Sequence, residues 1–247
     1  MATITIIGTG KMAEAIIAGL AGSYETIEVV GRNAQALQNL ASKYPIQTAP
    51  LENFDIEGKT VILAVKPYAL EEVRKQLCGK AHILISILAG TSLEALRSID
   101  AQYYARAMPN IAASKKASTT TIMGDSEAKA KALEIFEKIG KTIAVDTEKE
   151  LDIATAIAGS GPAFLALAEE AIVDGGVACG LTRESAKALT KGLFASYAAL
   201  ADMHPAAIKE SVMSPGGTTA AGIKALEAKA VRAAFIDAIT AAYERTK

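Results

Sequence analysis

The stretch that decides the fold lies at the beginning of the chain and reads Thr3-Ile4-Thr5-Ile6-Ile7-Gly8-Thr9-Gly10-Lys11-Met12-Ala13. It is an apolar, β-branched run followed at once by a G-x-G-x-x-A pattern that opens a helical segment. In this pattern the first glycine makes a tight turn, the second lets the backbone approach a pyrophosphate, and the alanine lets helix and strand pack closely. The stretch therefore predicts a strand, a dinucleotide-binding turn and a helix, whose first amide groups attract the anion. The alternative is a glycine-rich turn without a ligand.

Short β-rich runs alternate with amphipathic helical segments over about the first 145 residues. The predicted strands are Thr3–Ile7, Ile27–Val30, Thr60–Val65, Ile83–Ile87, Tyr103–Ala107, Thr119–Met123 and Thr142–Val145. The predicted helices are Met12–Leu20, Ala34–Lys43, Leu70–Leu77 and Glu127–Ile139. Several strands are apolar throughout, as expected where helices cover both faces of a sheet. The order predicts an α/β, Rossmann-type doubly wound parallel sheet.

After about Glu148 the strand signals stop, and helical segments rich in Ala, Leu, Glu and Lys follow. We expect glycine-containing breaks between these helices at 159–162, 175–176, 180–182 and 214–217, with Pro162 and Pro215 opening helices. The predicted boundary divides a dinucleotide-binding domain, residues 1–147, from an all-α domain, residues 148–247.

The composition excludes several classes of protein. The formal net charge is −1, with 26 basic and 27 acidic residues interspersed, so there is no basic stripe for nucleic acid and no polybasic tail for a membrane. We expect no apolar run to reach the roughly 20 residues that span a bilayer, and the N-terminus has the pattern of a strand rather than of a signal peptide. Cys78 and Cys179 match no metal-ligand spacing and are expected to be small apolar fillers. We therefore expect a cytoplasmic protein with no metal, no nucleic acid and no membrane partner.

The end of the second predicted strand bears on the choice of cofactor. A site for NAD places Asp or Glu there to accept from the ribose hydroxyls, whereas this strand ends with Gly31, Arg32 and Asn33. An arginine can bind a 2′-phosphate with paired donors, which favours NADPH, with NADH possible but weaker. The alternative for Arg32 is a solvated surface side chain.

Ligands of doubly wound sheets bind beyond the carboxyl ends of the strands. Three further strand ends are therefore expected to share a crevice with the glycine turn. With that turn and the second strand, the candidate cofactor-binding residues are Gly8, Thr9, Gly10, Lys11, Met12, Arg32, Asn33, Ala64, Val65, Lys66, Pro67, Leu88, Ala89, Met108, Pro109 and Asn110.

Hydroxyl groups and glycine amides come together in the second half, in Ser211-Val212-Met213-Ser214-Pro215-Gly216-Gly217-Thr218-Thr219. Such a loop at the beginning of a helix can hold a carboxylate through backbone amides, hydroxyls and the helix dipole. The alternative is a turn with a helix cap.

Together these motifs resemble pyrroline-5-carboxylate reductase, from Gly8 almost to the C-terminus. The segments that carry the resemblance are Ala64–Pro67, Arg106–Asn110, Ala158–Phe164 and Ser214–Thr219, with 175–177 and 180–181 between the last two. The resemblance implies NADPH-dependent reduction of 1-pyrroline-5-carboxylate to L-proline, and a helical domain that interlocks with a partner subunit to give a homodimer or an assembly of dimers.

The resemblance also implies roles for residues of the second half. The substrate-binding residues would be Ser211, Ser214, Gly216, Gly217, Thr218 and Thr219, with Thr219 as the catalytic contact to the ring nitrogen. It implies an acidic group near the substrate at Glu148 and an adenosine-side amide at Asn53. His82 and His204 are expected to be structural or solvated rather than general acids.

Three other interpretations remain open at this stage. One is a β-hydroxyacid reductase, although no Lys follows Gly175 and Gly176 at the spacing such enzymes use. The others are an imine reductase with a larger pocket and a non-catalytic NADPH-binding protein.

Overall fold

The computed structural model describes residues 3–24 and 26–246, which form two compact units. Unit 1 is Met1–Ser160 with Ala242–Lys247, and unit 2 is Gly161–Ala241.

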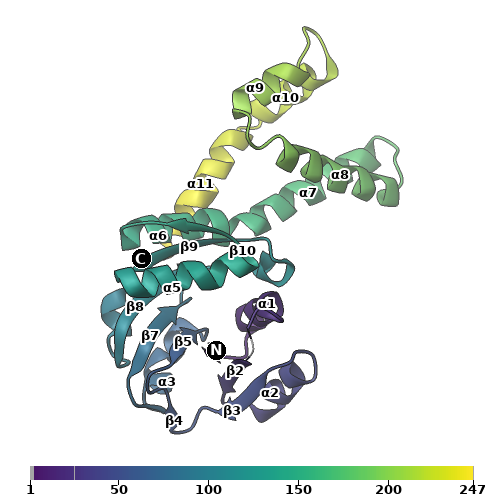
Figure 1. Ribbon diagram of the computed structural model, residues 1–247. Helices are drawn as coiled ribbons and strands as arrows, with labels where there is room; N and C mark the ends of the chain where they lie inside the picture. The colour runs from purple at the N-terminus through teal and green to yellow at the C-terminus, as the bar shows by residue number, and fades with distance from the viewer. Residues whose placement is uncertain (1–2, 25, 247) are drawn as a thin grey trace. The chain divides into compact units, whose positions relative to one another are not determined.

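Unit 1 is built on a sheet with the order β10-β9-β8-β7-β5-β1-β2-β3 (Figure 1). These strands are β1 (Thr3–Ile7), β2 (Thr26–Gly31), β3 (Gln47–Pro50), β5 (Thr60–Leu63), β7 (Ala81–Ser86), β8 (Ala101–Met108), β9 (Ser118–Gly124) and β10 (Gly140–Ala144). Two short strands, β4 (Phe54–Asp55) and β6 (Leu77–Cys78), pair separately. The helices are α1 (Lys11–Leu20), α2 (Ala34–Ala41), α3 (Leu70–Arg74), α4 (Leu93–Leu96), α5 (Ser126–Phe136) and α6 (Glu148–Ala154), with 3₁₀ turns η1 (Pro67–Ala69), η2 (Ile111–Lys115) and η3 (Glu137–Ile139).

The strands bury both of their faces, as their apolar sequences predict. In β5, Ile62 packs into one core with α1, α2 and α5, while Val61 and Leu63 pack into a second core with α3 and α4. Burial of this kind stabilises the fold by about 1.5–3 kcal/mol for each large apolar side chain. The predicted doubly wound architecture is thereby confirmed, and the carboxyl ends of β1, β2, β5 and β7 meet at one edge.

The sheet is mixed rather than wholly parallel, because β8 pairs with β9 antiparallel. Only residues 109–117 connect these two strands, and a parallel crossover needs a dozen residues or more. The crossover through α5 then returns β10 parallel to β9.

Every long strand lies where the sequence predicts one, whereas β3 was not predicted. This edge strand is short, mostly exposed and ends in Pro50, so it lacks the apolar signal on which the prediction depends. The helix predicted to Leu77 ends at Arg74, and Leu77 begins β6 instead.

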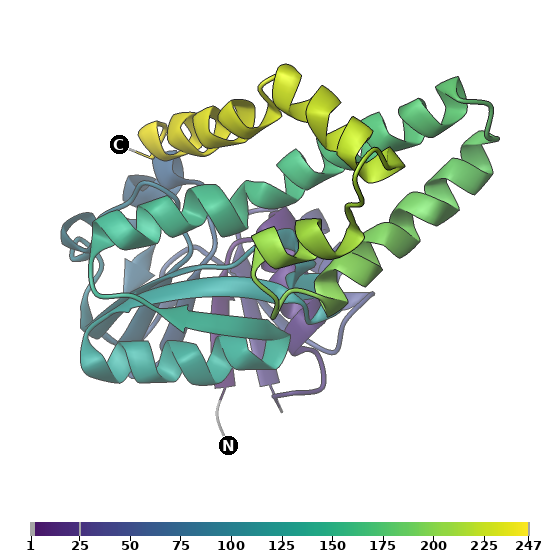
Figure 2. The ribbon, with the colours of Figure 1, turned by 90° about the horizontal axis from the view of Figure 1, so that it is seen from above.

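Unit 2 contains helices only. They are α7 (Gly161–Ala178), α8 (Arg183–Ala199), α9 (Pro205–Val212), α10 (Thr218–Ala228) and α11 (Val231–Glu244), the last of which ends in unit 1. Helices α7 and α8 form an antiparallel pair (Figure 2). The C-terminus of α7 closes with Gly180 in a positive-φ conformation, and the amide of Leu181 donates to Gly176 O.

Two of the predicted helix breaks are wrong. Gly175 and Gly176 lie inside α7, and a Cβ on Gly176 would come within 3.3 Å of the Ala186 Cβ of α8. The glycine therefore permits close helix packing rather than a break. At 159–162 the helix continues through a π-turn (Thr155–Gly159), in which the amide of Ser160 donates to Thr155 O.

Pro215 does not open a helix either, because α10 begins three residues later, at Thr218 after the cap residue Gly217. Pro162 lies in the first turn of α7, and Pro205 opens α9 behind His204, whose ring accepts from the amide of Ala206.

The 31-residue helical stretch Glu148–Ala178 is long and apolar enough to cross a bilayer, by length and composition alone. The expectation that no segment reaches that length is therefore corrected. Both cysteines are exposed, so the prediction that they fill apolar gaps is also wrong.

Candidate functional site

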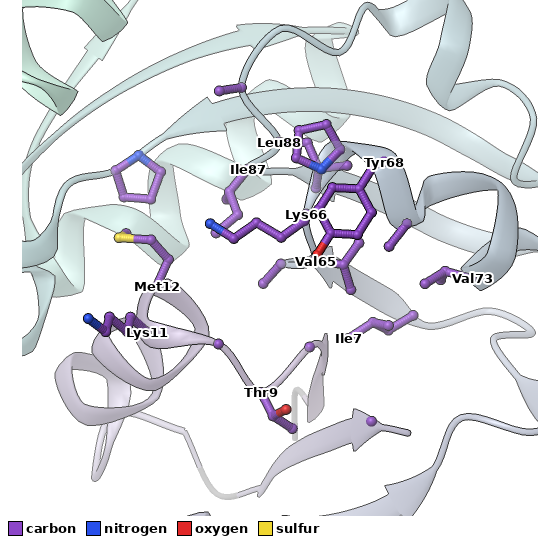
Figure 3. A pocket seen from close by; sticks show the side chains of 18 of the residues that line it. Ile7, Thr9, Lys11, Met12, Val65, Lys66, Tyr68, Val73, Ile87 and Leu88 are labelled. Atoms are coloured by element: carbon purple, nitrogen blue, oxygen red, sulfur yellow. The ribbon is translucent and has the colours of Figure 1, made fainter. Parts of the chain in front are cut away.

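A pocket of about 850 Å³ opens at the carboxyl ends of β1, β2, β5, β7 and β8. Every predicted cofactor-binding residue lines it, from Gly8 in the first turn to Asn110 after β8. Figure 3 shows how the side chains converge from the β1–α1 turn and from the segment that follows β5. The crevice expected from the strand ends is therefore present in one unit of the molecule.

Glycine is required at Gly8, Gly10 and Gly31 for three different reasons. Gly8 has φ +132, and a Cβ there would come within 2.4 Å of the Ala64 carbonyl oxygen of the neighbouring strand end. Gly31 makes room for the Thr9 methyl group, which a Cβ would meet at 2.8 Å. Around Gly10 there is open space instead, so a bound group can approach its backbone.

Helix α1 begins at this turn without a side-chain cap, since its cap residue is Gly10. The first amide groups of a helix have no intrahelical acceptor, so they point to the pocket as donors. Together with the open space at Gly10, these donors fit a pyrophosphate, and Lys11 adds a positive side chain at the pocket wall.

The segment after β5 forms a second wall. Lys66 extends into the pocket, with Lys11 and Met12 on the other side of it (Figure 3). Within the described residues no carboxylate lies at ion-pair distance from Lys66 or Lys11. Tyr68 lies beside Lys66 and is 87% exposed, which is unusual for an aromatic residue. The pocket therefore has cationic and aromatic groups at its mouth.

A third wall is held in place by Asn110. Its side-chain oxygen accepts from the Ala112 amide, and its Nδ2 donates to Ala158 O at 3.0 Å, inside the π-turn. Thr155 and Gly159 of that π-turn line the pocket. Both polar ends of the Asn110 side chain are thus used within the protein, and Asn110 shapes the pocket rather than offering a free amide.

A buried arginine and two partly exposed carboxylates join β8 to α6. The Arg106 side chain is 2% exposed and donates to Glu148 Oε1 at 3.2 Å and to Asp152 Oδ1 at 2.9 Å. Glu148 Oε1 also accepts from the Leu93 amide at 2.7 Å. The carboxylates of Glu148 and Asp152 lie one turn apart on α6, so Arg106 fastens that helix to the end of β8. This geometry gives Glu148 a structural use that sequence reasoning did not identify.

The end of β2 carries a second ion pair. Arg32 NH1 donates to Glu72 Oε1 of α3, and both side chains are more than half exposed. The side-chain oxygen of Asn33 caps α2 by accepting from the Ala36 amide. The acid that the sequence lacks at the tip of β2 is thus supplied by another element, 40 residues away.

The loop of unit 2 has the arrangement expected from its sequence. Gly216 has φ +72, Gly217 is the cap residue without a side-chain cap, and α10 begins at Thr218. Among the described residues no hydrogen bond is made by the hydroxyls of Thr218 and Thr219. Ser211 is already engaged, because its hydroxyl donates to Ile208 O within α9. The Gly217 amide donates to Ser214 O at 2.9 Å, so the donors at this helix N-terminus are the first amides of α10 and the hydroxyls of Thr218 and Thr219.

Some pocket residues were not predicted. Besides apolar residues of the strand ends and Ala69 and Val73 of the segment that follows β5, they are Tyr68, Ile111 and Thr155. Tyr68 follows the Lys66-Pro67 strand end directly, which was a usable signal, whereas Thr155 reaches the pocket only through tertiary packing. Asn53 does not line the pocket; its carbonyl accepts from Cys78 Sγ. The described residues contain no cluster of potential metal ligands.

Known proteins resemble the chain over nearly its whole length. It is 40% identical to the pyrroline-5-carboxylate reductase of Synechocystis sp., with 98% of this chain and 96% of that protein covered. The crystal structure of 1-pyrroline-5-carboxylate reductase from Streptococcus pyogenes superposes with a TM-score of 0.88 at 32% identity, covering 99% and 98% of the two chains. A Plasmodium falciparum pyrroline carboxylate reductase with NADP bound has a TM-score of 0.86 at 26% identity, covering 100% and 98%.

The fold and the pocket define a dinucleotide-binding oxidoreductase. Residues 3–90 match the family described as NADP oxidoreductase coenzyme F420-dependent, and residues 148–247 match the family described as pyrroline-5-carboxylate reductase dimerisation. The chain belongs to the pyrroline-5-carboxylate reductase family.

Proposed function

We propose that this chain catalyses the NADPH-dependent reduction of 1-pyrroline-5-carboxylate to L-proline, the last step of proline biosynthesis. The observation that carries the proposal is the single pocket that gathers all the predicted cofactor residues, in a chain related to pyrroline-5-carboxylate reductases over both of its halves. Family membership favours this reaction over the β-hydroxyacid, larger imine and non-catalytic alternatives.

The cofactor is assigned to this pocket of unit 1. The amides after Gly10 bind the pyrophosphate, Lys11 and Lys66 supply positive charge, and Arg32 binds the 2′-phosphate. NADPH supplies the hydride when it is bound. The protein's part is to hold the nicotinamide against the wall made by Met108 to Asn110 and the π-turn.

The substrate is assigned to the Ser214–Thr219 loop of unit 2. Its carboxylate is bound by the Gly216 amide, by the first amides of α10 after the cap residue Gly217, and by the hydroxyls of Ser214 and Thr218. The Gly217 amide itself donates to Ser214 O, and Ser211 contributes less because its hydroxyl is used. The free hydroxyl of Thr219 then contacts the ring nitrogen and orients the imine carbon for hydride attack.

The described histidines do not have the surroundings of general acids. His82 lies at the other end of the sheet, against Gln102 and Glu127, and His204 caps α9. A protonated imine is already electrophilic, so orientation is the main requirement placed on the protein.

We further propose a functional division into 1–147 for the cofactor and 148–247 for substrate binding and dimerisation. The dimerisation family matches the same residues 148–247. A cytoplasmic homodimer or assembly of dimers follows from this proposal, and the apolar stretch 148–178 then serves subunit contact rather than a bilayer.

The test is steady-state oxidation of NADPH by the purified full chain with 1-pyrroline-5-carboxylate, and proline is identified as the product. Turnover with this imine, and none with β-hydroxyacids or bulkier imines, is the expected result. Binding of NADPH without turnover of any imine would contradict the proposed activity.

A further inference from the structure

A second, smaller pocket of about 320 Å³ adjoins the main one at the end of β2. The two pockets share Gly31, Arg32 and Leu51 as lining residues. The remaining lining of the small pocket comes from the end of β3 and from α3, and includes Glu52 and Glu72. Among the described residues that line it, Arg32 is the one basic side chain, and Glu52 and Glu72 are the two acidic ones.

We infer that Glu72 is a specificity-determining residue, which competes with the 2′-phosphate of NADPH for Arg32 and thereby lowers the preference for NADPH over NADH. The inference rests on the assignment of Arg32 to the 2′-phosphate made above.

The geometry supports competition because the guanidinium edge that would bind a phosphate is already engaged. Arg32 NH1 lies 2.5 Å from Glu72 Oε1, across 40 residues of sequence. An arginine binds phosphate best with two parallel donors, so a carboxylate on NH1 removes part of that fork. Either the ion pair opens when NADPH binds, or the phosphate is held by fewer donors.

Charge points the same way. A phosphate monoester carries about −1.5 to −2 at pH 7, and its approach to Arg32 brings it near the Glu72 carboxylate. NADH has a hydroxyl at this position and meets no such repulsion. Glu72 therefore weakens the binding of NADPH and not that of NADH, so it changes the preference between the two cofactors.

The expected effect is moderate because both side chains are more than half exposed. Exposed ion pairs of this kind shift an equilibrium by roughly twofold to fivefold. The apparent affinity for NADPH is reduced by the fraction of molecules in which Arg32 is engaged, so removing the carboxylate charge restores about the same factor.

Three variants of the full chain test the inference: Glu72→Gln, Arg32→Ala and the double variant. Glu71→Gln is the matched control, since Glu71 precedes Glu72 on α3, pairs with Arg74 at 3.2 Å and lines neither pocket. Dissociation constants for NADPH and NADH are measured by fluorescence of the reduced nicotinamide.

We expect Glu72→Gln to lower the NADPH dissociation constant by about twofold to fivefold and to leave that of NADH unchanged. Glu71→Gln should change neither, and in the Arg32→Ala background Glu72→Gln should give no gain. An equal gain for NADH, or the same gain without Arg32, would overturn the inference. So would weaker NADH binding in Glu72→Gln, because Glu72 would then be a ribose-hydroxyl acceptor.

The same variants test separately the competition by Glu72 and the assignment of Arg32 to the 2′-phosphate. If Arg32→Ala weakened NADPH and NADH equally, the assignment of Arg32 to the phosphate would fail whatever Glu72 does. If Arg32→Ala weakened NADPH selectively while Glu72→Gln had no effect, only the competition would fail. Catalytic turnover is not needed for either conclusion.

Discussion

At the scale of single residues, the proposed chemistry depends on hydroxyl groups that the protein does not use for itself. Thr219 lies in the first turn of α10, and its hydroxyl has no hydrogen-bond partner among the described residues. Ser211, by contrast, donates to its own helix. The difference predicts that the two hydroxyls contribute unequally to catalysis.

Thr219→Ala should lower kcat by about tenfold to a hundredfold, because losing a hydrogen bond to a charged group costs about 1.5–3 kcal/mol and disorders the imine. Steady-state kinetics give kcat, and a nicotinamide fluorescence titration gives NADPH affinity, which should be unchanged. Ser211→Ala is the control and should stay within a fewfold of the parent. A Thr219→Ala enzyme with the kcat of the parent, or one that had lost NADPH binding, would contradict the assignment of this loop to the substrate.

Tyr24 is a residue whose environment predicts a pH dependence of stability. Its buried hydroxyl has no partner among the described residues, and Lys138 lies 5.2 Å above its ring. Burial raises the pKa of the Tyr24 phenol to about 12, and the Glu134 carboxylate adds to the shift. The fold thus favours the protonated phenol, so this contribution to stability is complete below the unfolded pKa of 10.0 and is lost as pH rises from 10 to about 12.

Tyr24→Phe should therefore lose less stability than the parent chain between pH 10 and 12, since it has no phenol to ionise. Urea unfolding of both proteins across this pH range gives the difference between their free energies of unfolding. Groups that titrate in both proteins do not contribute to that difference. At pH 8 the variant should be at least as stable, because it lacks an unsatisfied buried hydroxyl. Parallel stability curves for the two proteins would contradict the assignment.

At the scale of elements, α6 and the π-turn after it depend on Arg106. This side chain fastens α6 through Glu148 and Asp152, while Asn110 holds the π-turn through Ala158 O. A π-turn inside a helix is an uncommon feature that is frequent at functional sites, and here it contributes Thr155 and Gly159 to the pocket. The buried ion pairs therefore act on the pocket wall as well as on stability.

Arg106→Met should destabilise unit 1 by about 1.5–3 kcal/mol, because it removes the charged donor of two carboxylates that are themselves only partly exposed. Arg106→Lys keeps the charge but not the two-donor geometry, and its loss should be smaller. Thermal unfolding measures the stability of each variant. Titration of the folded Arg106→Lys variant with NADPH tests the pocket wall, and we expect a weaker affinity for NADPH. Asp146→Asn, at an exposed carboxylate 3.8 Å from Lys129, is the control and should change neither property.

At the scale of the whole molecule, unit 2 lacks a core of its own. Val173, Ala186 and Thr190 are its buried residues within the described chain, and α9, α10 and α11 bury none. Large apolar side chains are exposed along every helix of this unit, for example Leu167, Leu189, Val212, Leu226 and Ile236. An apolar surface of this extent indicates burial against another subunit, as the match to a dimerisation family indicates too.

Leu167→Glu should therefore weaken the assembly. Leu167 is 68% exposed on α7 in the single chain, and the glutamate that replaces it would place a charge in the interface. Light scattering over a range of concentrations should show dimers or larger assemblies for the parent and a shift toward monomers for the variant. Lys191→Glu on α8 is the charge-changing control. A parent chain that is monomeric and active at assay concentrations would contradict the proposed assembly.

The sequence by itself determined the features that depend on neighbouring residues. The apolar strand before Gly8, the glycine turn, the strand–helix alternation and the change to helices after Glu148 all follow from local patterns of burial and backbone freedom. For the same reason it located the residues that line the pocket, since the carboxyl ends of parallel strands must meet at one edge of a sheet. Where the local pattern is weak, as in the exposed edge strand β3, the prediction failed.

Only the tertiary structure decided the features that join distant parts of the chain. Arg32 meets Glu72 across 40 residues, and Arg106 meets Asp152 across 46. Gly176 is accommodated inside α7 because Ala186 of another helix packs against it, whereas its local propensity predicted a break. Charge partners and close helix contacts depend on which elements lie side by side, and the periodicity of the sequence does not predict which elements these are.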